Sequence, residues 1–273
     1  MADRADSVPG AGYEEQYEAR YEERPSRTVA GAVLWRAGGA GSGIVLPDGC
    51  MDLLWVDGRL LVAGPDTAPH PAGEVPGSGF AGIRLAPGAA PALLGVPARL
   101  LRDRRVELAD LWPAAEVRRL TARVASYGDP RAGLEELARL RTADGGLPDP
   151  LVAEVAARLR AGQGVAAVAG AVGLGERQLH RRSLDAFGYG PRTLGRILRL
   201  QRALALTRRG LPQAAVAAAA GYADQAHYTR EVRALAGTTP GAYAAGAAYA
   251  AGSAGSAGAK REIPEPSGSR TTA

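Results

Sequence analysis

Two short segments of the chain carry side chains that could contact the edges of DNA bases. Gln225 and Arg230 have the hydrogen-bonding groups that read adenine and guanine in the major groove. Residues three or four positions apart share one face of a helix, so Ala226 and Thr229 accompany them on that face. The outward residues of the first segment, at a similar spacing, are Arg177, His180 and Arg181. Side chains of these types can recognise a DNA sequence, and they must lie on helices that can enter the major groove.

The elements that must position these side chains have the pattern of two helix-turn-helix units, residues 165–187 and 213–235. Gly173 and Gly221 supply the turns, since a positive φ costs little only for glycine. Asp224 is the expected N-cap of the second recognition helix. The inward apolar residues recur at helical spacing and are Leu179 and Phe187, then Tyr228, Val232 and Leu235.

One long helix, residues 191–209, is predicted between the two units. At 1.5 Å per residue it is about 28 Å long. One turn of B-DNA is about 34 Å, so two recognition helices at its ends could enter successive major grooves. The arginines expected to meet phosphates are Arg192, Arg196, Arg199, Arg202 and Arg209 of this helix, and Arg233 of the second unit.

The distribution of charge agrees with an anionic partner. Residues 149–245 hold thirteen arginines and six acidic residues, whereas residues 1–148 hold 17 basic and 20 acidic residues. The positive charge therefore lies on the segment with the helix-turn-helix patterns, as phosphate contact requires. The alternative is a helical module that packs on another protein, because arginine-rich faces are often only solvated.

Residues 151–245 resemble the AraC/XylS-type helix-turn-helix domain. The resemblance is carried by the stretches VAAVAGAVGLGERQLHRR, FGYGPRTLGRILRLQRAL and AAAAGYADQAHYTREVRALAGTTPGAY. The family implies sequence-specific transcriptional regulation, with base contacts from residues early in each recognition helix. At the matching positions these residues are Arg177, His180, Arg181, Gln225, Ala226, Thr229 and Arg230. The chain departs from the family at Ser183 and Val232, where phenylalanine is usual, and at Gly175, where a serine cap is usual.

The first half of the chain has the pattern of a β-rich domain. Short apolar runs at residues 29–35, 42–46, 51–56, 60–63 and 79–85 predict strands, and Asp57-Gly58 predicts a hairpin turn. The stretches VLPDGCMDLLW and GIRLAPGAAPALLGVPARLLRDRRVELADLW are similar to a poorly characterised domain that often precedes AraC-type modules. By analogy with the sensor domains of that family, a cupin-like barrel is one candidate for its fold.

Several residues of this β-rich domain could line an effector pocket with apolar walls and a few polar groups. They are Trp35, Cys50, Asp52, Trp55 and His70, with Met51 and Asp66 beside them. The alternative is that Trp35, Met51 and Trp55 are ordinary core residues. Cys50 is expected to be a buried, inert thiol, because nothing nearby in the sequence is strongly basic.

Composition excludes several other classes of protein. Cys50 is the only cysteine, which excludes an internal disulfide and any multi-cysteine zinc site. No apolar run approaches the length of a membrane span, and the first residues lack the pattern of a signal peptide. The three histidines lie in no recognisable catalytic motif. We therefore expect a cytoplasmic, nucleoid-associated protein that is not an enzyme and has no metal or cofactor.

The sequence thus predicts an α+β protein in which a β-rich domain precedes an all-α double helix-turn-helix domain. The expected segments are a flexible arm (1–27), the β-rich domain (28–112), a helical linker (113–148), the DNA-binding domain (149–245) and a disordered tail (246–273). Double-stranded DNA is the expected partner, and the further candidates are a small-molecule effector, RNA polymerase and a second copy of the chain. Two other hypotheses remain: a ligand-binding or enzymatic first domain whose helical module no longer binds DNA, and a DNA-binding protein without an effector.

Overall fold

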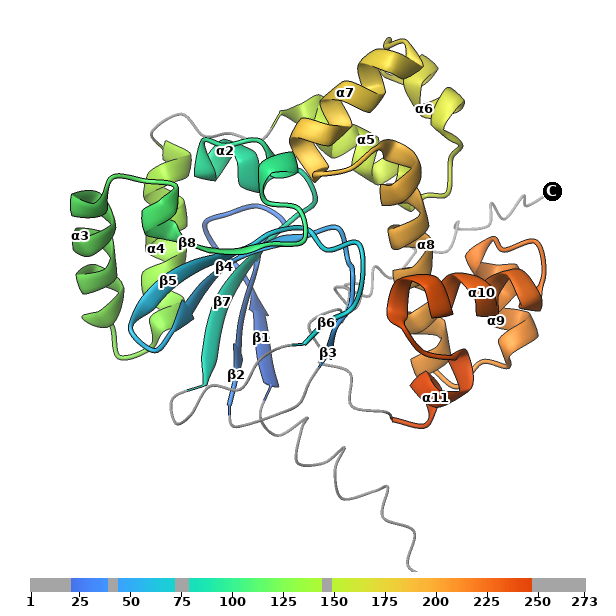
Figure 1. The fold of residues 1–273 in the computed structure, drawn as a ribbon, viewed down its shortest axis with the longest axis horizontal. Helices are drawn as coiled ribbons and strands as arrows, with labels where there is room; N and C mark the ends of the chain where they lie inside the picture. The colour runs from blue at the N-terminus through green and yellow to red at the C-terminus, as the bar shows by residue number, and fades with distance from the viewer. Residues whose placement is uncertain (1–20, 39–43, 72–78, 144–148, 247–273) are drawn as a thin grey trace, which may run out of the picture.

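A computed structural model describes residues 21–38, 44–71, 79–143 and 149–246. A β-sheet with helices on one side forms the N-terminal domain, and an all-helical C-terminal domain packs beside it (Figure 1). The α+β organisation expected from the sequence is confirmed. The predicted disordered tail, from residue 247 on, and the predicted flexible arm up to residue 20 lie outside the described residues. No helix in the described ranges is long and apolar enough to cross a membrane.

The main sheet has six strands, in the order β1-β2-β7-β4-β5-β8, and every neighbouring pair is antiparallel. The strands are β1 (Tyr21–Pro25), β2 (Val33–Ala37), β4 (Met51–Val56), β5 (Arg59–Ala63), β7 (Phe80–Leu85) and β8 (Arg105–Glu107). Asp57 and Gly58 both have positive φ, which confirms the predicted hairpin turn between β4 and β5.

This sheet is open, with β1 and β8 at its two edges, so the described strands do not close into the cupin-like barrel that analogy suggested. A separate two-stranded sheet consists of β3 (Ile44–Val45) and β6 (His70–Pro71). It lies between the main sheet and the helical domain (Figure 1).

One face of the main sheet is covered by helices. Side chains alternate between the two faces of a strand, so Leu53 of β4 and Ile83 of β7 both point to the covered face. The covering elements are α2 (Ala90–Leu94), α3 (Ala114–Ala125) and α4 (Pro130–Ala143), and two short 3-10 turns, Ala98–Leu100 and Leu108–Asp110, accompany them. Val124 and Leu134 share one hydrophobic core with the strands. The helices of residues 113–148 therefore belong to the N-terminal domain, which corrects their interpretation as a linker.

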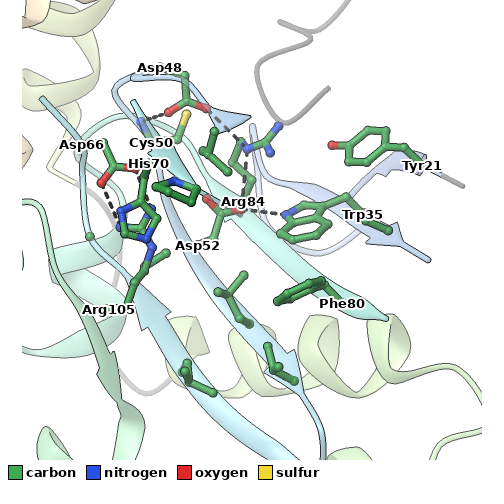
Figure 2. Close-up of a pocket in the computed structure, with 18 residues that line it drawn as sticks. Tyr21, Trp35, Asp48, Cys50, Asp52, Asp66, His70, Phe80, Arg84 and Arg105 are labelled. Carbon is green, nitrogen blue, oxygen red and sulfur yellow. Dashed lines mark hydrogen bonds and ion pairs between the residues drawn. The ribbon is translucent and has the colours of Figure 1, made fainter. Parts of the chain in front are cut away.

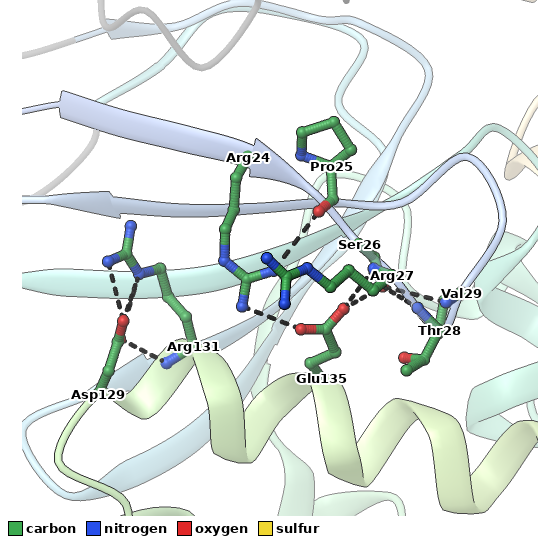
Figure 3. Close-up of polar contacts among 9 residues, drawn as sticks. All are labelled: Arg24, Pro25, Ser26, Arg27, Thr28, Val29, Asp129, Arg131 and Glu135. Atoms are coloured by element: carbon green, nitrogen blue, oxygen red, sulfur yellow. Dashed lines mark hydrogen bonds and ion pairs between the residues drawn. The ribbon is translucent and has the colours of Figure 1, made fainter.

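Residues 21–27 were expected to belong to a flexible arm, but β1 pairs with β2 along its whole length. The turn that follows β1 is held by Glu135 of α4 (Figure 3). The Glu135 carboxylate accepts hydrogen bonds from Arg24 Nη2 at 2.9 Å, from Ser26 Oγ at 2.8 Å and from the amide of Arg27 at 2.5 Å. The prediction of a flexible arm is therefore wrong for residues 21–27. Their fixed position was not evident from the sequence, because the carboxylate that binds them lies more than a hundred residues further along the chain.

The C-terminal domain is built around one central helix. Its elements are α5 (Pro150–Arg160), α6 (Val165–Ala171), α7 (Glu176–Phe187), α8 (Pro191–Arg208), α9 (Gln213–Ala220), α10 (Gln225–Ala236) and α11 (Pro240–Ala244). Leu194, Ile197 and Leu204 of α8 are fully buried in its core. The first unit packs at one end of α8 and the second unit at the other (Figure 1). The bounds predicted for the two helix-turn-helix units and for the helix between them agree with the structure to within one residue at each end, whereas α11 was not predicted.

The two domains contact each other through the segment between β3 and β4. Leu46 is 1% exposed and belongs to the hydrophobic core of the helical domain. The carbonyl of Pro47 accepts a hydrogen bond from Gln201 Nε2 of α8 at 2.6 Å. On the other side of the interface, Arg99 Nε and Asp185 Oδ1 of α7 form an ion pair at 2.7 Å. Residues 46–50, named here the interdomain loop, therefore join the sheet to the central helix.

Candidate DNA-binding surface and effector pocket

The predicted base-contact residues lie on the two recognition helices, α7 and α10. Asp224 Oδ1 accepts a hydrogen bond from the amide of His227 at 2.6 Å, so Asp224 begins α10 as its N-cap. The predicted residues that are exposed are Arg177, His180 and Arg181 on α7, and Gln225, Ala226 and Arg230 on α10. Thr229 is half-buried, and its hydroxyl donates to the carbonyl of Gln225 at 2.9 Å. Gln225 itself is oriented by a hydrogen bond from its Nε2 to Gln213 Oε1 at 3.2 Å.

His180 is exposed, but its ring lies against the start of α8. A Cβ at Gly190 would be 2.6 Å from Cε1 of His180, so only glycine leaves room for the ring in this position. One side of the imidazole is therefore occupied by the protein and the other faces solvent.

Three of the six arginines expected to meet phosphates have partners inside the domain. Arg196 forms two 2.9 Å hydrogen bonds with the carboxylate of Glu231 on α10, and these bonds lower the pKa of Glu231. Arg199 lies 5.2 Å from the ring centre of Tyr222 and donates to the carbonyl of Gly221 at 3.3 Å. Arg202 donates to the carbonyl of Arg160 at the end of α5.

These three arginines hold α5, α9 and α10 onto α8, which argues against the phosphate role given to them. The face of α8 that carries them is partly covered by its neighbours, and helical spacing alone does not reveal that contact. Arg192, Arg209 and Arg233 are exposed, and none of them forms an ion pair with another described residue. They remain candidates for phosphate contact.

A cavity of about 260 Å³ lies on the face of the sheet opposite the helices, roofed in part by the two-stranded sheet (Figure 2). Trp35, Cys50, Asp52 and His70 line it, as the sequence suggested. Trp55 does not line it, because residues 52, 54 and 56 of β4 face the cavity and residue 55 faces the helices. The lining residues that the sequence interpretation missed include Tyr21, Asp48, Phe80, Arg84 and Arg105.

The polar end of the cavity is organised around Arg84 (Figure 2). Its Nε lies 3.5 Å from Asp48 Oδ2 and 3.6 Å from Asp52 Oδ1, and Trp35 Nε1 donates to Asp52 Oδ1 at 2.7 Å. Burial alone would lower the pKa of Arg84, but the two carboxylates raise it, so the guanidinium stays charged. Beside this group, Arg105 binds Asp66 through two hydrogen bonds of 2.8 and 2.7 Å.

The remaining polar residues of the cavity are not reactive groups. Burial raises the pKa of the Cys50 thiol well above its ordinary value, so the sulfur is a poor nucleophile. Burial also lowers the pKa of His70, which keeps the imidazole neutral. Within the described ranges, no three His, Cys, Asp or Glu side chains are grouped so that they could hold a metal ion. The cavity has the composition of a binding site, with apolar walls and few polar groups.

Comparison with family models decides what the helical domain is. Residues 168–246 match a helix-turn-helix domain family. The C-terminal domain is an AraC-type helix-turn-helix domain. A domain of this type supports a DNA-binding transcription regulator, and regulators with AraC-type domains are typically not enzymes. Residues 33–107 match a domain of unknown function, DUF6597, so this domain is the one that precedes the AraC-type domain here. No curated protein matches the chain in sequence.

Among solved structures, the chain is similar to ToxT from Vibrio cholerae. An apo variant from strain SCE256 has a TM-score of 0.40 and 10% identity, covering 82% of this chain and 96% of that one. ToxT from strain O395 bound to (E)-4-(8-methylnaphthalen-1-yl)but-3-enoic acid also gives 0.40 and 10%, covering 82% and 98%. Wild-type ToxT bound to an unsaturated fatty acid gives 0.36 and 10%, covering 82% and 93%.

The departures from the AraC-type pattern concern the first unit most. Ser183 is 1% exposed, and its hydroxyl has no hydrogen-bond partner in the described part of the chain. An unsatisfied buried hydroxyl is unfavourable, so α7 packs less well here than with a large apolar residue. Gly175 has no side chain to cap α7, but its amide donates to Gln178 Oε1 at 3.3 Å. Val232 of α10 is fully buried in the hydrophobic core of the helical domain.

Proposed function

We propose that the regulator reads two successive major-groove segments of DNA through α7 and α10. The observation that carries the proposal is the placement of two recognition helices, with exposed polar faces, at opposite ends of one helix (Figure 1). The 18 residues of α8 correspond to about 27 Å, close to one turn of B-DNA at about 34 Å. A monomer with two recognition helices can bind an asymmetric site alone, so the proposal does not require a homodimer.

The roles within this surface follow from chemistry and exposure. The residues proposed to contact bases are Arg177, His180, Arg181, Gln225, Ala226, Thr229 and Arg230. Arg192 and Arg233 are proposed to contact phosphates, because both are exposed and have no ion-pair partner among the described residues. Phosphate contacts supply affinity that falls with salt, and base contacts supply the sequence preference.

The deciding experiment is fluorescence anisotropy of the full chain with its own upstream DNA and with scrambled DNA, over a series of salt concentrations. Tighter binding to its own DNA, weakening with salt, is expected. If both DNAs bind equally, a selection from random sequences identifies any preferred site elsewhere. Failure of that selection would contradict the proposal and favour a helical module that no longer reads DNA.

Substituting Arg230→Ala tests a single base contact. We expect specific binding to weaken by about 1–3 kcal/mol and one base preference to relax, because a guanidinium can bind guanine through two hydrogen bonds. Arg118→Ala, which removes an exposed arginine of α3 in the other domain, is the matched control. An unchanged sequence preference in Arg230→Ala would show that this side chain does not read a base.

We further propose that a small molecule in the cavity controls DNA binding. The supporting observation is that the interdomain loop belongs to both sites. Asp48 of this loop faces Arg84 in the cavity, while Pro47 binds Gln201 of α8 and Gly49 lies close to Leu194. A ligand that displaces Asp48 therefore moves a segment that contacts the helix between the two recognition units, and its differential affinity for the two arrangements sets the size of the response.

A further inference from the structure

The charges that line the cavity do not balance. Among the described lining residues the charged groups are Asp48, Asp52, Asp66, Arg84 and Arg105. Arg105 and Asp66 neutralise each other through two short hydrogen bonds. Arg84 is left with two carboxylates, Asp48 and Asp52, at 3.5 and 3.6 Å. One guanidinium cannot neutralise both, so the lining of the cavity carries one carboxylate in excess.

This excess charge is held away from water. The side chains of Asp48 and Asp52 are 20% and 17% exposed, and that of Arg84 is 11% exposed. Burial raises the pKa of Asp52 and raises that of Asp48 to about 6, although Arg84 acts in the opposite direction. Both shifts mean that the negative charge is poorly solvated in the folded protein. A second positive charge in the cavity would relieve this cost.

The rest of the cavity suits an apolar body with a positive head. The ring of Trp35 lies over Gly82, where a Cβ would be only 2.5 Å from the indole, and stacks on Tyr21 with 6.1 Å between the ring centres. Phe80 continues the wall away from the carboxylates (Figure 2), and Leu54 also lines the cavity. Aromatic faces attract cations and pack against apolar groups, so this wall is compatible with both parts of such a molecule.

We propose that the cavity binds a small, largely apolar molecule with a single positive charge, its ammonium group beside Asp48 and Asp52 and its apolar body against Trp35, Phe80 and Leu54. An anionic ligand is disfavoured, because the lining already carries three carboxylates against two guanidiniums, and a further negative charge would be repelled. This inference rests on the proposed ligand control of the regulator, and it specifies the ligand's chemical class.

The test compares three molecules with one skeleton and different head groups: 4-phenylbutylamine, 4-phenylbutanol and 4-phenylbutyrate. Binding to the full chain without DNA is followed by calorimetry and by tryptophan fluorescence, which Trp35 makes sensitive to the cavity. The amine is expected to bind at least about tenfold more tightly than the other two, the size of effect typical of a charge-assisted hydrogen bond. Equal binding of all three, tightest binding of the butyrate, or no binding of the amine at millimolar concentration would overturn the inference.

Variants separate the charge from the shape of the cavity. Asp48→Asn keeps the oxygen that accepts the Cys50 amide at 2.8 Å and removes the charge, so it should weaken the amine at least about tenfold and leave the alcohol unchanged. Asp52→Asn is a second variant with the same expectation. Asp110→Asn, an exposed carboxylate outside the cavity, is the matched control. Amine binding unaffected by both cavity variants would contradict the proposed head-group site.

The pH dependence of binding gives an independent readout. Protonation of Asp48 removes the excess charge, so amine affinity should fall as the pH drops through about 6, where the pKa of Asp48 lies. The charged and titratable groups that face Asp48 are Arg84, Asp52, Asp66, Cys50 and Tyr189. Asp48→Asn should flatten this profile. If the amine binds as expected but does not change DNA affinity, the ligand class stands and the proposed control of DNA binding fails.

Discussion

Glu135→Ala is expected to lower the free energy of unfolding by about 2–4 kcal/mol, the range for removing one partner from a buried, charged hydrogen-bond network. Glu135 is 9% exposed and accepts three hydrogen bonds, from Arg24, Ser26 and the amide of Arg27 (Figure 3). Alanine leaves the Arg27 amide and the Ser26 hydroxyl without this acceptor. It also releases the turn that joins β1 to β2, so the edge of the sheet should fray. Denaturant unfolding followed by tryptophan fluorescence measures the loss, since all three tryptophans lie in the N-terminal domain.

The contribution of Glu135 should also depend on pH. Burial alone would raise the pKa of Glu135, but its hydrogen bonds more than offset that effect and hold the pKa below the ordinary 4.5. A group whose pKa is lowered by folding stabilises the folded state above its unfolded pKa and loses that contribution as the pH falls through the folded value. The stability difference between wild type and Glu135→Ala should therefore shrink below pH 4.5.

The control for this prediction is the next residue on the same helix. Glu136 is half-buried, and it pairs with the more exposed Arg123 and Arg139 at the surface of α3 and α4. Surface ion pairs contribute little to stability, so Glu136→Ala should change the unfolding curve far less than Glu135→Ala. Equal effects of the two substitutions would mean that the buried carboxylate does not hold the β1 turn.

The second large loss of stability is expected for Leu46→Ala. Leu46 belongs to the N-terminal domain in sequence, but its side chain packs in the core of the helical domain. Leu46 is 1% exposed within the hydrophobic core that α8 organises. Truncating a buried leucine to alanine costs about 2–5 kcal/mol, from lost burial and from the cavity left behind. The unfolding transitions followed by the circular dichroism of the helices and by tryptophan fluorescence should no longer coincide, because the contact between the domains is weakened.

The same substitution tests whether the interdomain loop carries the response to a ligand. If the loop couples the cavity to α8, Leu46→Ala should reduce the effect of a bound ligand on DNA affinity while the ligand still binds. Leu100→Ala is the matched control, because Leu100 is 50% exposed and the same atoms are removed from a site without burial. A Leu46→Ala protein with wild-type stability and an undiminished ligand response would exclude this role for the loop.

The helical domain could be predicted well because its determinants are local. Asp149 and Asp224 accept the amides that begin α5 and α10, and the predicted turn residues Gly173 and Gly221 have positive φ. Capping and helical periodicity act within a few residues, so they are legible in the sequence. The sequence prediction that Asp52 and Trp55 line one pocket was wrong, although their separation by an odd number of positions in one strand already places them on opposite faces.

The sites depended on contacts between distant residues. Arg196, Arg199 and Arg202 have the spacing of a phosphate-binding face, but whether α9 and α10 cover that face is decided by packing. Arg84 becomes the centre of the cavity only because β7 pairs with β4, which sets Arg84 opposite Asp52. The sequence predicted that α3 and α4 are helices, but it did not predict that they pack on a face of the sheet.

By itself, the sequence determined the helix-turn-helix pattern and the positions of its helices and of the hairpin turn, because these depend on residue type and spacing over one or two turns. Only the tertiary structure decided that Arg196 pairs with Glu231, which carboxylates share Arg84, and that Leu46 joins the two domains. Burial and charge pairing are sums over neighbours from the whole chain, and a side chain's partner more than a hundred residues away, as between Ser26 and Glu135, leaves no local signal.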